Sequence, residues 1–164
     1  MIHMKKYIKI GVLVLVVLFI AAQFIRPDLT NPPIDAAQTL AAVDPPPGDI
    51  DLILSRSCND CHTNHTQYPW YSKITPSNWF LANHIKDGRR HLNFSEWGTY
   101  SPKKRAKKYE EICEMVTSRE MPLPSYLWLH GESAMSDADI KTVCDWTNAE
   151  AAKQTIEATE GGSR

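Results

Sequence analysis

Two cysteines and a histidine stand close together near the middle of the chain, at Cys58, Cys61 and His62. Cysteines three positions apart fall on one helical turn, where both sulfurs can form thioethers with the two vinyl groups of one porphyrin. The histidine that follows directly is then placed to bind the iron as its proximal ligand. The spacing C-x-x-C-H therefore predicts one covalently attached haem c.

Three other roles for these thiols stay open on the sequence. A thioredoxin-like redox pair needs a βαβ context, which the surrounding pattern does not provide. A zinc site formed by the two cysteines with His65 lacks a second C-x-x-C or H-x-x-x-H pair to complete it. A disulfide between residues three apart would be strained and leaves His62 without a role.

A haem iron has a second face, and Met121 is the favoured distal ligand for it. This methionine lies in the segment REMPLP, residues 119–124, whose two prolines prevent helix formation and stiffen the loop. Methionine opposite histidine raises the reduction potential of the iron. Met115 lies inside an expected helix and Met135 lies beside a helix cap, so both are weaker candidates.

Two histidines are the alternative distal ligands. His91 and His84 stand seven residues apart with Gly88 between them, so they can share one helical face. Together with Arg89 and Arg90, they are also candidates to contact a haem propionate.

The stretches between these residues carry the signals of short helices. Thr75-Pro76 and Ser101-Pro102 each combine an N-cap residue with a proline at the first helical position. The residues from Ser136 to Asp139 resemble a capping box. We expect helices at residues 49–56, 75–90 and 101–118, and from residue 136 onward. Because so few helices can bury only a small apolar core, we expect a cofactor at the centre of the domain.

Two further cysteines fall on the apolar faces of the last two expected helices. Cys113 shares its face with Tyr109, Ile112 and Val116, and Cys144 lies on the equivalent face of the helix after residue 136. Face-to-face packing of these helices would form a disulfide in an oxidising compartment. The alternative is two buried free thiols that act as small hydrophobic side chains.

The composition limits the possible partners. The 164 residues include 18 Lys and Arg against 19 Asp and Glu, which gives a net charge of -1. This balance does not favour nucleic acid as a partner. The length allows one domain with an appendage.

The N-terminus carries an apolar run. Lys5, Lys6 and Lys9 precede residues 10–25, which contain no charged side chain and span about 24 Å as a helix. We expect an uncleaved transmembrane helix, and a cleaved signal peptide is the alternative. The positive-inside rule then predicts a single-pass protein of the cytoplasmic membrane, with the haem domain on the periplasmic, extracytoplasmic side.

These observations divide the chain into four parts. Residues 1–25 are the expected signal anchor, and residues 26–48 form a proline-rich extended tether. The haem-binding domain covers residues 49–152, and residues 153–164 form a polar tail. The predicted fold is all-α: a small cytochrome c-like helical domain around a covalent haem, preceded by one transmembrane helix.

Several segments resemble bacterial proteins that carry the haem-binding domain of the cytochrome c-like class. They are CNDCHTNHTQYPW at 58–70, HLNFSEW at 91–97, EEIC at 110–113 and EMPLPSY at 120–126. The resemblance covers about residues 26–148. It implies attachment through Cys58 and Cys61, His62 as proximal ligand, Met121 as distal ligand, and a closing helix from residue 136.

Three functions are compatible with this sequence. The first is a membrane-tethered cytochrome c that carries single electrons between unidentified redox partner proteins and catalyses no reaction of its own. The second is a haem enzyme or gas sensor with an exchangeable distal site, in which His91, Arg89 and Arg90 act as peroxidase-like distal groups. The third is an interaction domain in which haem only completes the core.

Overall fold

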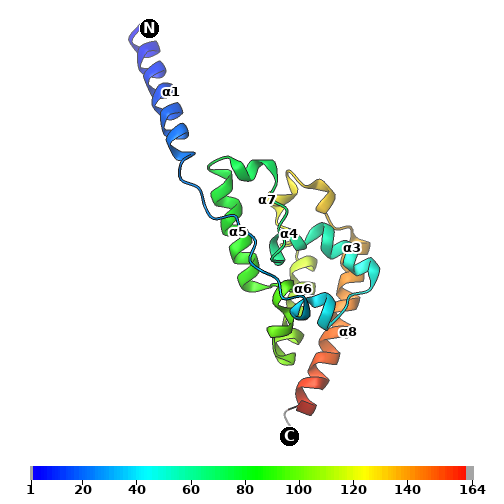
Figure 1. Cartoon of the computed structure of the whole chain (residues 1–164). Helices are drawn as coiled ribbons and strands as arrows, with labels where there is room; N and C mark the ends of the chain where they lie inside the picture. Colours follow the sequence, from blue (N-terminus) through cyan, green and yellow to red (C-terminus); the bar gives the residue numbers. More distant parts are fainter. Residues whose placement is uncertain (1, 162–164) are drawn as a thin grey trace. The chain divides into compact units, whose positions relative to one another are not determined.

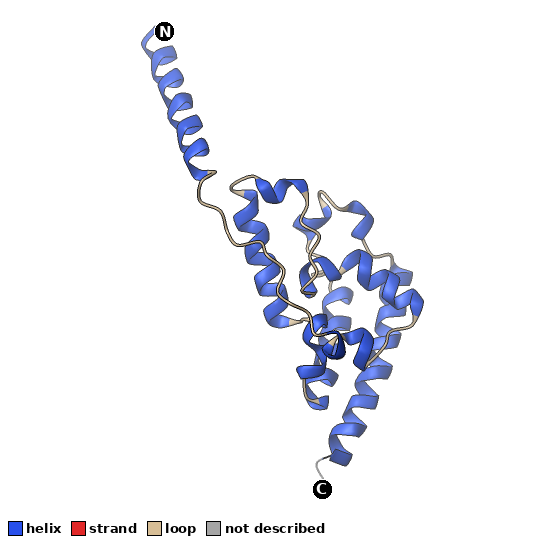
Figure 2. Ribbon diagram, in the orientation of Figure 1, coloured by secondary structure: helices blue, strands red, loops and turns tan. Residues whose placement is uncertain are grey.

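The computed structural model describes residues 2–161, and helices are its only regular elements in that range (Figure 2). The all-α part of the predicted fold is thus confirmed for the described chain. The elements, labelled in Figure 1, are α1 (Ile2–Ala22), η1 (Ala36–Gln38), α2 (Leu40–Val43), α3 (Gly48–Ser57), α4 (Asn59–His62), η2 (Trp70–Lys73), α5 (Ser77–His91), η3 (Phe94–Thr99), α6 (Pro102–Thr117), α7 (Pro124–Leu127), η4 (Gly131–Ser133) and α8 (Asp137–Gly161).

The predicted transmembrane helix is wrong. Among the described residues, no helix combines the length and the apolar character needed to span a bilayer. Helix α1 contains Lys5, Lys6 and Lys9 and ends at Ala22. Its uncharged part, residues 10–22, spans about 20 Å, against about 30 Å of hydrocarbon core. The predicted single-pass location in the cytoplasmic membrane depended on that helix and is overturned with it.

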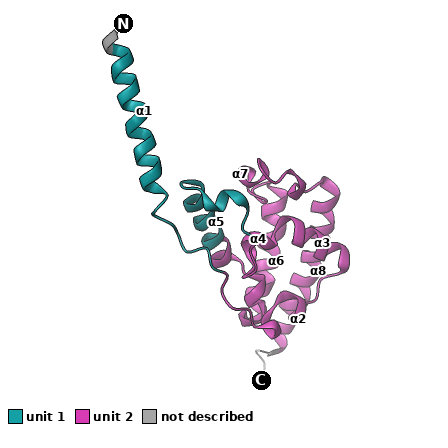
Figure 3. Ribbon diagram, turned by 45° about the horizontal axis from the view of Figure 1, so that its top comes forward, with its two compact units in different colours: residues 1–30, 67–87 teal, residues 31–66, 88–164 magenta. Residues whose placement is uncertain are grey.

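The chain divides into two compact units, residues 1–30 with 67–87 and residues 31–66 with 88–164 (Figure 3). In the first unit, the chain that follows α1 is bound to the start of α5. The side-chain amide of Gln23 accepts from the backbone N–H of Thr75 at 2.9 Å and donates to its carbonyl at 3.0 Å. The indole N–H of Trp79 donates to the carbonyl of Ile25 at 2.8 Å.

The second unit contains the hydrophobic core. Helices α6 and α8 pack against each other more extensively than any other pair of elements, and α3, η3 and α2 complete the core. The buried side chains that form it are Leu40, Ile50, Ile53, Leu54, Phe94, Trp97, Tyr100, Tyr109, Ile112, Val116, Met135, Val143, Trp146 and Ala151.

The starts of α6 and α8 follow the capping signals of the sequence, whereas α5 begins at Ser77, after the Thr75-Pro76 pair predicted to open it. The hydroxyl of Ser101 accepts from the backbone N–H of Lys104 at 3.3 Å, with Pro102 as the first residue of α6. At the start of α8, the carboxylate of Asp139 accepts from the backbone N–H of Ser136 at 2.9 Å, and the hydroxyl of Ser136 accepts from the N–H of Asp139 at 3.1 Å. This reciprocal pair is a capping box with aspartate at its fourth position.

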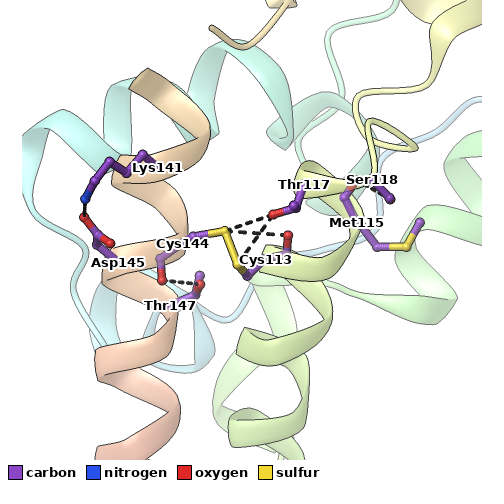
Figure 4. Close-up of a disulfide and its surroundings, with 8 residues drawn as sticks. All are labelled: Cys113, Met115, Thr117, Ser118, Lys141, Cys144, Asp145 and Thr147. Carbon is purple, nitrogen blue, oxygen red and sulfur yellow. Dashed lines mark hydrogen bonds and ion pairs between the residues drawn. A yellow bond between two sulfur atoms is a disulfide. The ribbon is translucent and has the colours of Figure 1, made fainter. Parts of the chain in front are cut away.

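A disulfide joins α6 to α8. The Sγ atoms of Cys113 and Cys144, the pair indicated by the sequence, are 2.02 Å apart (Figure 4). The hydroxyl of Thr117, one turn further along α6, lies 3.4 Å from the Sγ atom of Cys144.

The proline-rich segment differs from the expected unpacked tether. Residues 36–43 form η1 and α2, and Leu40 is buried in the core. A Cβ atom added at Gly98, in η3, would come within 3.1 Å of the Cα atom of Gln38, so these backbones approach closely. At the other end of the chain, α8 continues through residues 153–161, where a polar tail was expected.

Candidate haem-binding site

The C-x-x-C-H motif lies at a sharp change of helix direction. Cys58 ends α3 by donating its N–H to the carbonyl of Leu54 at 2.9 Å, and the same residue begins α4. Its carbonyl then accepts from the N–H groups of Cys61 at 3.2 Å and His62 at 3.0 Å. All three residues of the motif are thereby held on one turn.

Both motif cysteines are free thiols in partly buried positions. Burial raises the pKa of Cys58 to about 12 and that of Cys61 to about 11. Redox-active and metal-binding cysteines function as thiolates with lowered pKa values, so this environment does not favour a thioredoxin-like pair. Within residues 2–161 no three His, Cys, Asp or Glu side chains converge as a metal site.

The ring of His62 is oriented by the backbone. Its Nδ1 atom lies 3.0 Å from the carbonyl of Leu92, so Nδ1 carries the proton and Nε2 keeps a free lone pair. A backbone carbonyl on the other ring nitrogen is the usual support of a metal-binding histidine. Burial lowers the pKa of His62, against the opposing effects of this hydrogen bond and of the Gly88 backbone. Two protonated thiols and a neutral, oriented imidazole fit the donor set that a haem c needs.

The chain after the motif is held by a network of polar side chains. The guanidinium of Arg89 donates to the carbonyl of Thr63 at 2.7 Å and to the hydroxyl of Thr66 at 2.8 Å. The amide of Asn93 donates to the side-chain oxygen of Asn64 at 2.9 Å, and both residues are buried. Arg89, expected near a propionate, is thus used to fix residues 63–66.

The end of α5 touches the backbone of the motif. A Cβ atom added at Gly88 would lie 2.9 Å from the carbonyl oxygen of Cys61, closer than real Cβ contacts. The sequence showed this glycine only as a residue between two histidines, and no pattern marked the close approach. The motif turn therefore depends on the absence of a side chain at position 88.

The segment that carries Met121 is tied to α4 and α3 by one hydrogen bond each. The hydroxyl of Tyr126 in α7 donates to the carboxylate of Asp60 at 2.9 Å. The hydroxyl of Ser133 in η4 donates to the carbonyl of Arg56, near the end of α3, at 2.7 Å. Met121 lies between these anchors and the end of α6, and the segment is thereby positioned by α3 and α4.

Met121 is half-buried and lines a cavity of about 240 Å³. Met135 and Ile140 lie on the same cavity wall, and His62 does not line it. The chain enters this region through Arg119, whose φ of 61° turns the backbone away from the end of α6. The guanidinium of Arg119 donates to the carbonyl of Met135 at 2.9 Å.

The two alternative distal ligands have different surroundings. His84 lies in the first unit, where its Nδ1 atom is 2.8 Å from the carbonyl of Phe80 and its ring packs on the phenyl ring. His91 is the exposed last residue of α5 and precedes Leu92, whose carbonyl lies on the Nδ1 side of the His62 ring. A distal ligand has to approach from the Nε2 side, so this position does not favour His91.

Comparison with known proteins supports a haem cofactor. A family model described as a haem-binding domain matches residues 17–149. No curated protein and no solved structure matches the chain. The family match covers the motif, the Met121 segment and the core helices, and it extends over most of the 164 residues. The chain therefore belongs to the haem-binding domain family.

Proposed function

We propose that the protein binds one haem c, attached through Cys58 and Cys61 and ligated by His62 on its proximal side. The observation that carries this proposal is the combination of two free thiols on one turn with an imidazole whose Nδ1 is bonded to Leu92. A histidine oriented in this way presents Nε2 as a ready ligand.

We propose Met121 as the distal ligand. In support, the segment with this methionine is stiffened by Pro122 and Pro124 and anchored to α4 through Tyr126 and Asp60. A thioether held by such a segment loses little conformational freedom on binding. Met115, the weaker candidate within α6, is fixed by its helix.

The proposed activity is single-electron transfer between redox partner proteins. A bound haem supplies reversible one-electron chemistry, and the protein orients the ligands and excludes water. With His62 and Met121 both coordinated, no iron position is left for a substrate, so catalysis is not expected.

Covalent attachment is tested by intact-mass measurement of protein from cells that mature c-type cytochromes. The wild-type mass is expected to increase by one haem, and haem staining should survive a denaturing gel. The double variant Cys58→Ala/Cys61→Ala should lose both signals. Cys113→Ala/Cys144→Ala is the matched control, with two cysteines removed outside the motif, and should keep them. Haem that is extracted from the wild-type protein by acidified organic solvent would contradict covalent attachment.

A second candidate function is a haem enzyme or gas sensor with an exchangeable distal ligand. The cavity beside Met121 favours it, because displaced methionine and a small ligand both need space. Carbon monoxide added to the reduced protein separates the two functions. Rapid binding at the wild-type iron supports the sensor or enzyme, and no binding supports the electron carrier.

A further inference from the structure

A row of aromatic rings leads from His62 through the core of the second unit. Its successive ring centres are 6.3 Å apart from His62 to Phe94, 6.2 Å from Phe94 to Trp97, 4.8 Å from Trp97 to Tyr109 and 5.3 Å from Tyr109 to Trp146. All four separations lie in the range of directly packed aromatic pairs. The row begins at the proposed iron ligand and ends at a side chain on α8.

The third and fourth rings of the row share one acidic partner. The indole N–H of Trp97 donates to Oδ2 of Asp44 at 2.7 Å, and the hydroxyl of Tyr109 donates to the same oxygen at 3.3 Å. Trp97 and Tyr109 have no exposed surface. Packing alone would be satisfied by phenylalanine at both positions, without the cost of burying two polar groups and a carboxylate.

Asp44 is held in position by further donors. The amide of Gln154 donates to both carboxylate oxygens at 3.3 Å, and the guanidinium of Arg105 lies 3.9 Å from Oδ2. The Asp44 side chain is 12% exposed, so its charge is screened less than on the surface. Trp97 and Tyr109, the most readily oxidised kinds of side chain in the row, therefore lie beside a fixed proton acceptor.

We propose that this row carries oxidising equivalents away from a haem bound at His62, with Tyr109 as the side chain that is oxidised and Asp44 as the acceptor of its proton. The inference rests on the proposed haem site. The oxidant is a peroxide, which takes up two electrons and two solvent protons and leaves as two molecules of water. A bound ferrous haem would supply one electron at the haem edge and become ferric, so that both iron ligands stay in place, and Tyr109 would supply the other electron.

The electron from Tyr109 passes through Trp97 and Phe94. The phenolic O–H bond breaks, an O–H bond forms on Oδ2 of Asp44, and Tyr109 is left as a neutral radical. Trp146, 8% exposed, is the last ring before the surface and is the outlet for the oxidising equivalent. The function is protection of the haem against peroxide damage.

The test uses the haem-loaded full chain, mixed with one equivalent of hydrogen peroxide without an external donor. Electron paramagnetic resonance should detect a tyrosyl radical, and peptide mapping should find oxidation at Tyr109, Trp97 or Trp146. Tyr109→Phe keeps the ring and removes the O–H, so the radical signal should disappear and the haem should bleach several-fold faster. Asp44→Asn, which keeps the shape but accepts the proton poorly, should also weaken the signal.

Tyr68→Phe is the matched control, since Tyr68 lies in the first unit and outside the row, and it should behave as wild type. If Tyr109→Phe does not fold, Trp146→Phe provides the same test, because oxidation at the outer end of the row should be lost. If these variants bind haem and show the wild-type radical signal and bleaching rate, the proposed role of the aromatic row is overturned, while the proposed haem site is not affected. A preparation without haem would instead overturn the proposed function, and this inference with it.

Discussion

Replacing Gly88 with alanine is expected to destabilise the protein, although alanine usually stabilises a helix relative to glycine. Alanine normally stabilises a helix by about 0.5–1 kcal/mol relative to glycine. At position 88 the added Cβ would lie 2.9 Å from the carbonyl oxygen of Cys61, which is backbone and cannot rotate away. Gly88→Ala is expected to destabilise the folded protein by about 1–3 kcal/mol and to lower the haem content. Thermal unfolding and the ratio of haem to protein absorbance measure the two effects.

Gly48→Ala is the control for this prediction. Gly48 begins α3, and beyond its chain neighbours and its own helix backbone no atom lies within 4 Å of the position that its Cβ would occupy. The same substitution there should leave the haem content unchanged and should be neutral or slightly stabilising. Equal behaviour of the two variants would show that the contact with Cys61 does not constrain the motif.

A second prediction for a single residue concerns Met121 and the reduction potential of the haem. Met121→Ala is expected to lower the reduction potential, by part of the roughly 0.8 V range that axial ligands control. It should also open the iron to carbon monoxide. Spectroelectrochemical titration measures the potential. Met115→Ala removes the same side chain from α6 and should leave the potential at its wild-type value, whereas equal potentials in all three proteins would exclude Met121 as the ligand.

At the scale of elements, the disulfide between α6 and α8 is expected to stabilise the protein mainly by reducing the conformational entropy of the unfolded chain. It closes a loop between residues separated by 31 positions, which corresponds to about 3–4 kcal/mol on the chain-entropy model. Cys113→Ala/Cys144→Ala should therefore unfold at a lower urea concentration. With a reducing agent present, wild type and variant should unfold at nearly the same concentration, and a gap that persists after reduction would assign the effect to packing.

The capping box at the start of α8 is expected to make the stability of the folded protein depend on pH. Hydrogen bonds from the backbone and hydroxyl of Ser136 lower the pKa of Asp139 below its ordinary value of 3.8, and Arg56 adds to the effect. A carboxyl group with a lowered folded-state pKa stabilises the protein above the unfolded pKa, and this contribution is lost as the pH falls through the folded pKa. Asp139→Asn should therefore lower the Tm at pH 7 by an amount equivalent to less than about 1 kcal/mol.

The Tm difference between wild type and Asp139→Asn should close as the pH falls below about 4, which thermal unfolding at several pH values measures. Asp145→Asn removes an exposed carboxylate later in α8 that pairs with Lys141, and it should change the Tm little. A difference that stays constant in acid would assign the effect of Asp139 to something other than its charge.

The starts and caps of α6 and α8 were predictable because their signals are local. Ser101-Pro102 and the box from Ser136 to Asp139 begin α6 and α8 where the sequence placed them. The cysteine pair followed from helical periodicity in the same way. The site was predictable only in part: the motif fixes Cys58, Cys61 and His62, whereas the role of Leu92 depends on a backbone carbonyl that any residue would supply.

At the scale of the whole molecule, long-range contacts account for what the sequence did not reveal. Asp44 lies within the proline-rich segment at residues 26–48, which looks unpacked, yet it binds side chains from η3, α6 and α8. No local pattern encodes such a contact, because the partners are 53, 65 and 110 positions away. The prediction of a transmembrane helix at the N-terminus was wrong for the opposite reason. The local apolar pattern there is strong, but α1 ends at Ala22 and includes three lysines.

The core also bears on the expectation that the domain needs a cofactor at its centre. Its buried residues come from α2, α3, η3, α6 and α8 and from Tyr100 and Met135, and residues 59–66 contribute none of them. The disulfide joins two of these helices independently of the motif. The haem-free variant Cys58→Ala/Cys61→Ala is therefore expected to keep a folded core around α6 and α8 and to lose order around the motif.

Hydrogen exchange distinguishes these two regions. In the haem-free variant, the backbone amides of Ile112 and Val143 should stay protected, since both side chains are buried in the core. Amides of residues 59–66 and 119–127 should exchange faster than in the haem-loaded protein, because the ligands that they position have lost their common partner. Uniform loss of protection over the second unit would show instead that haem is required for the core itself to fold.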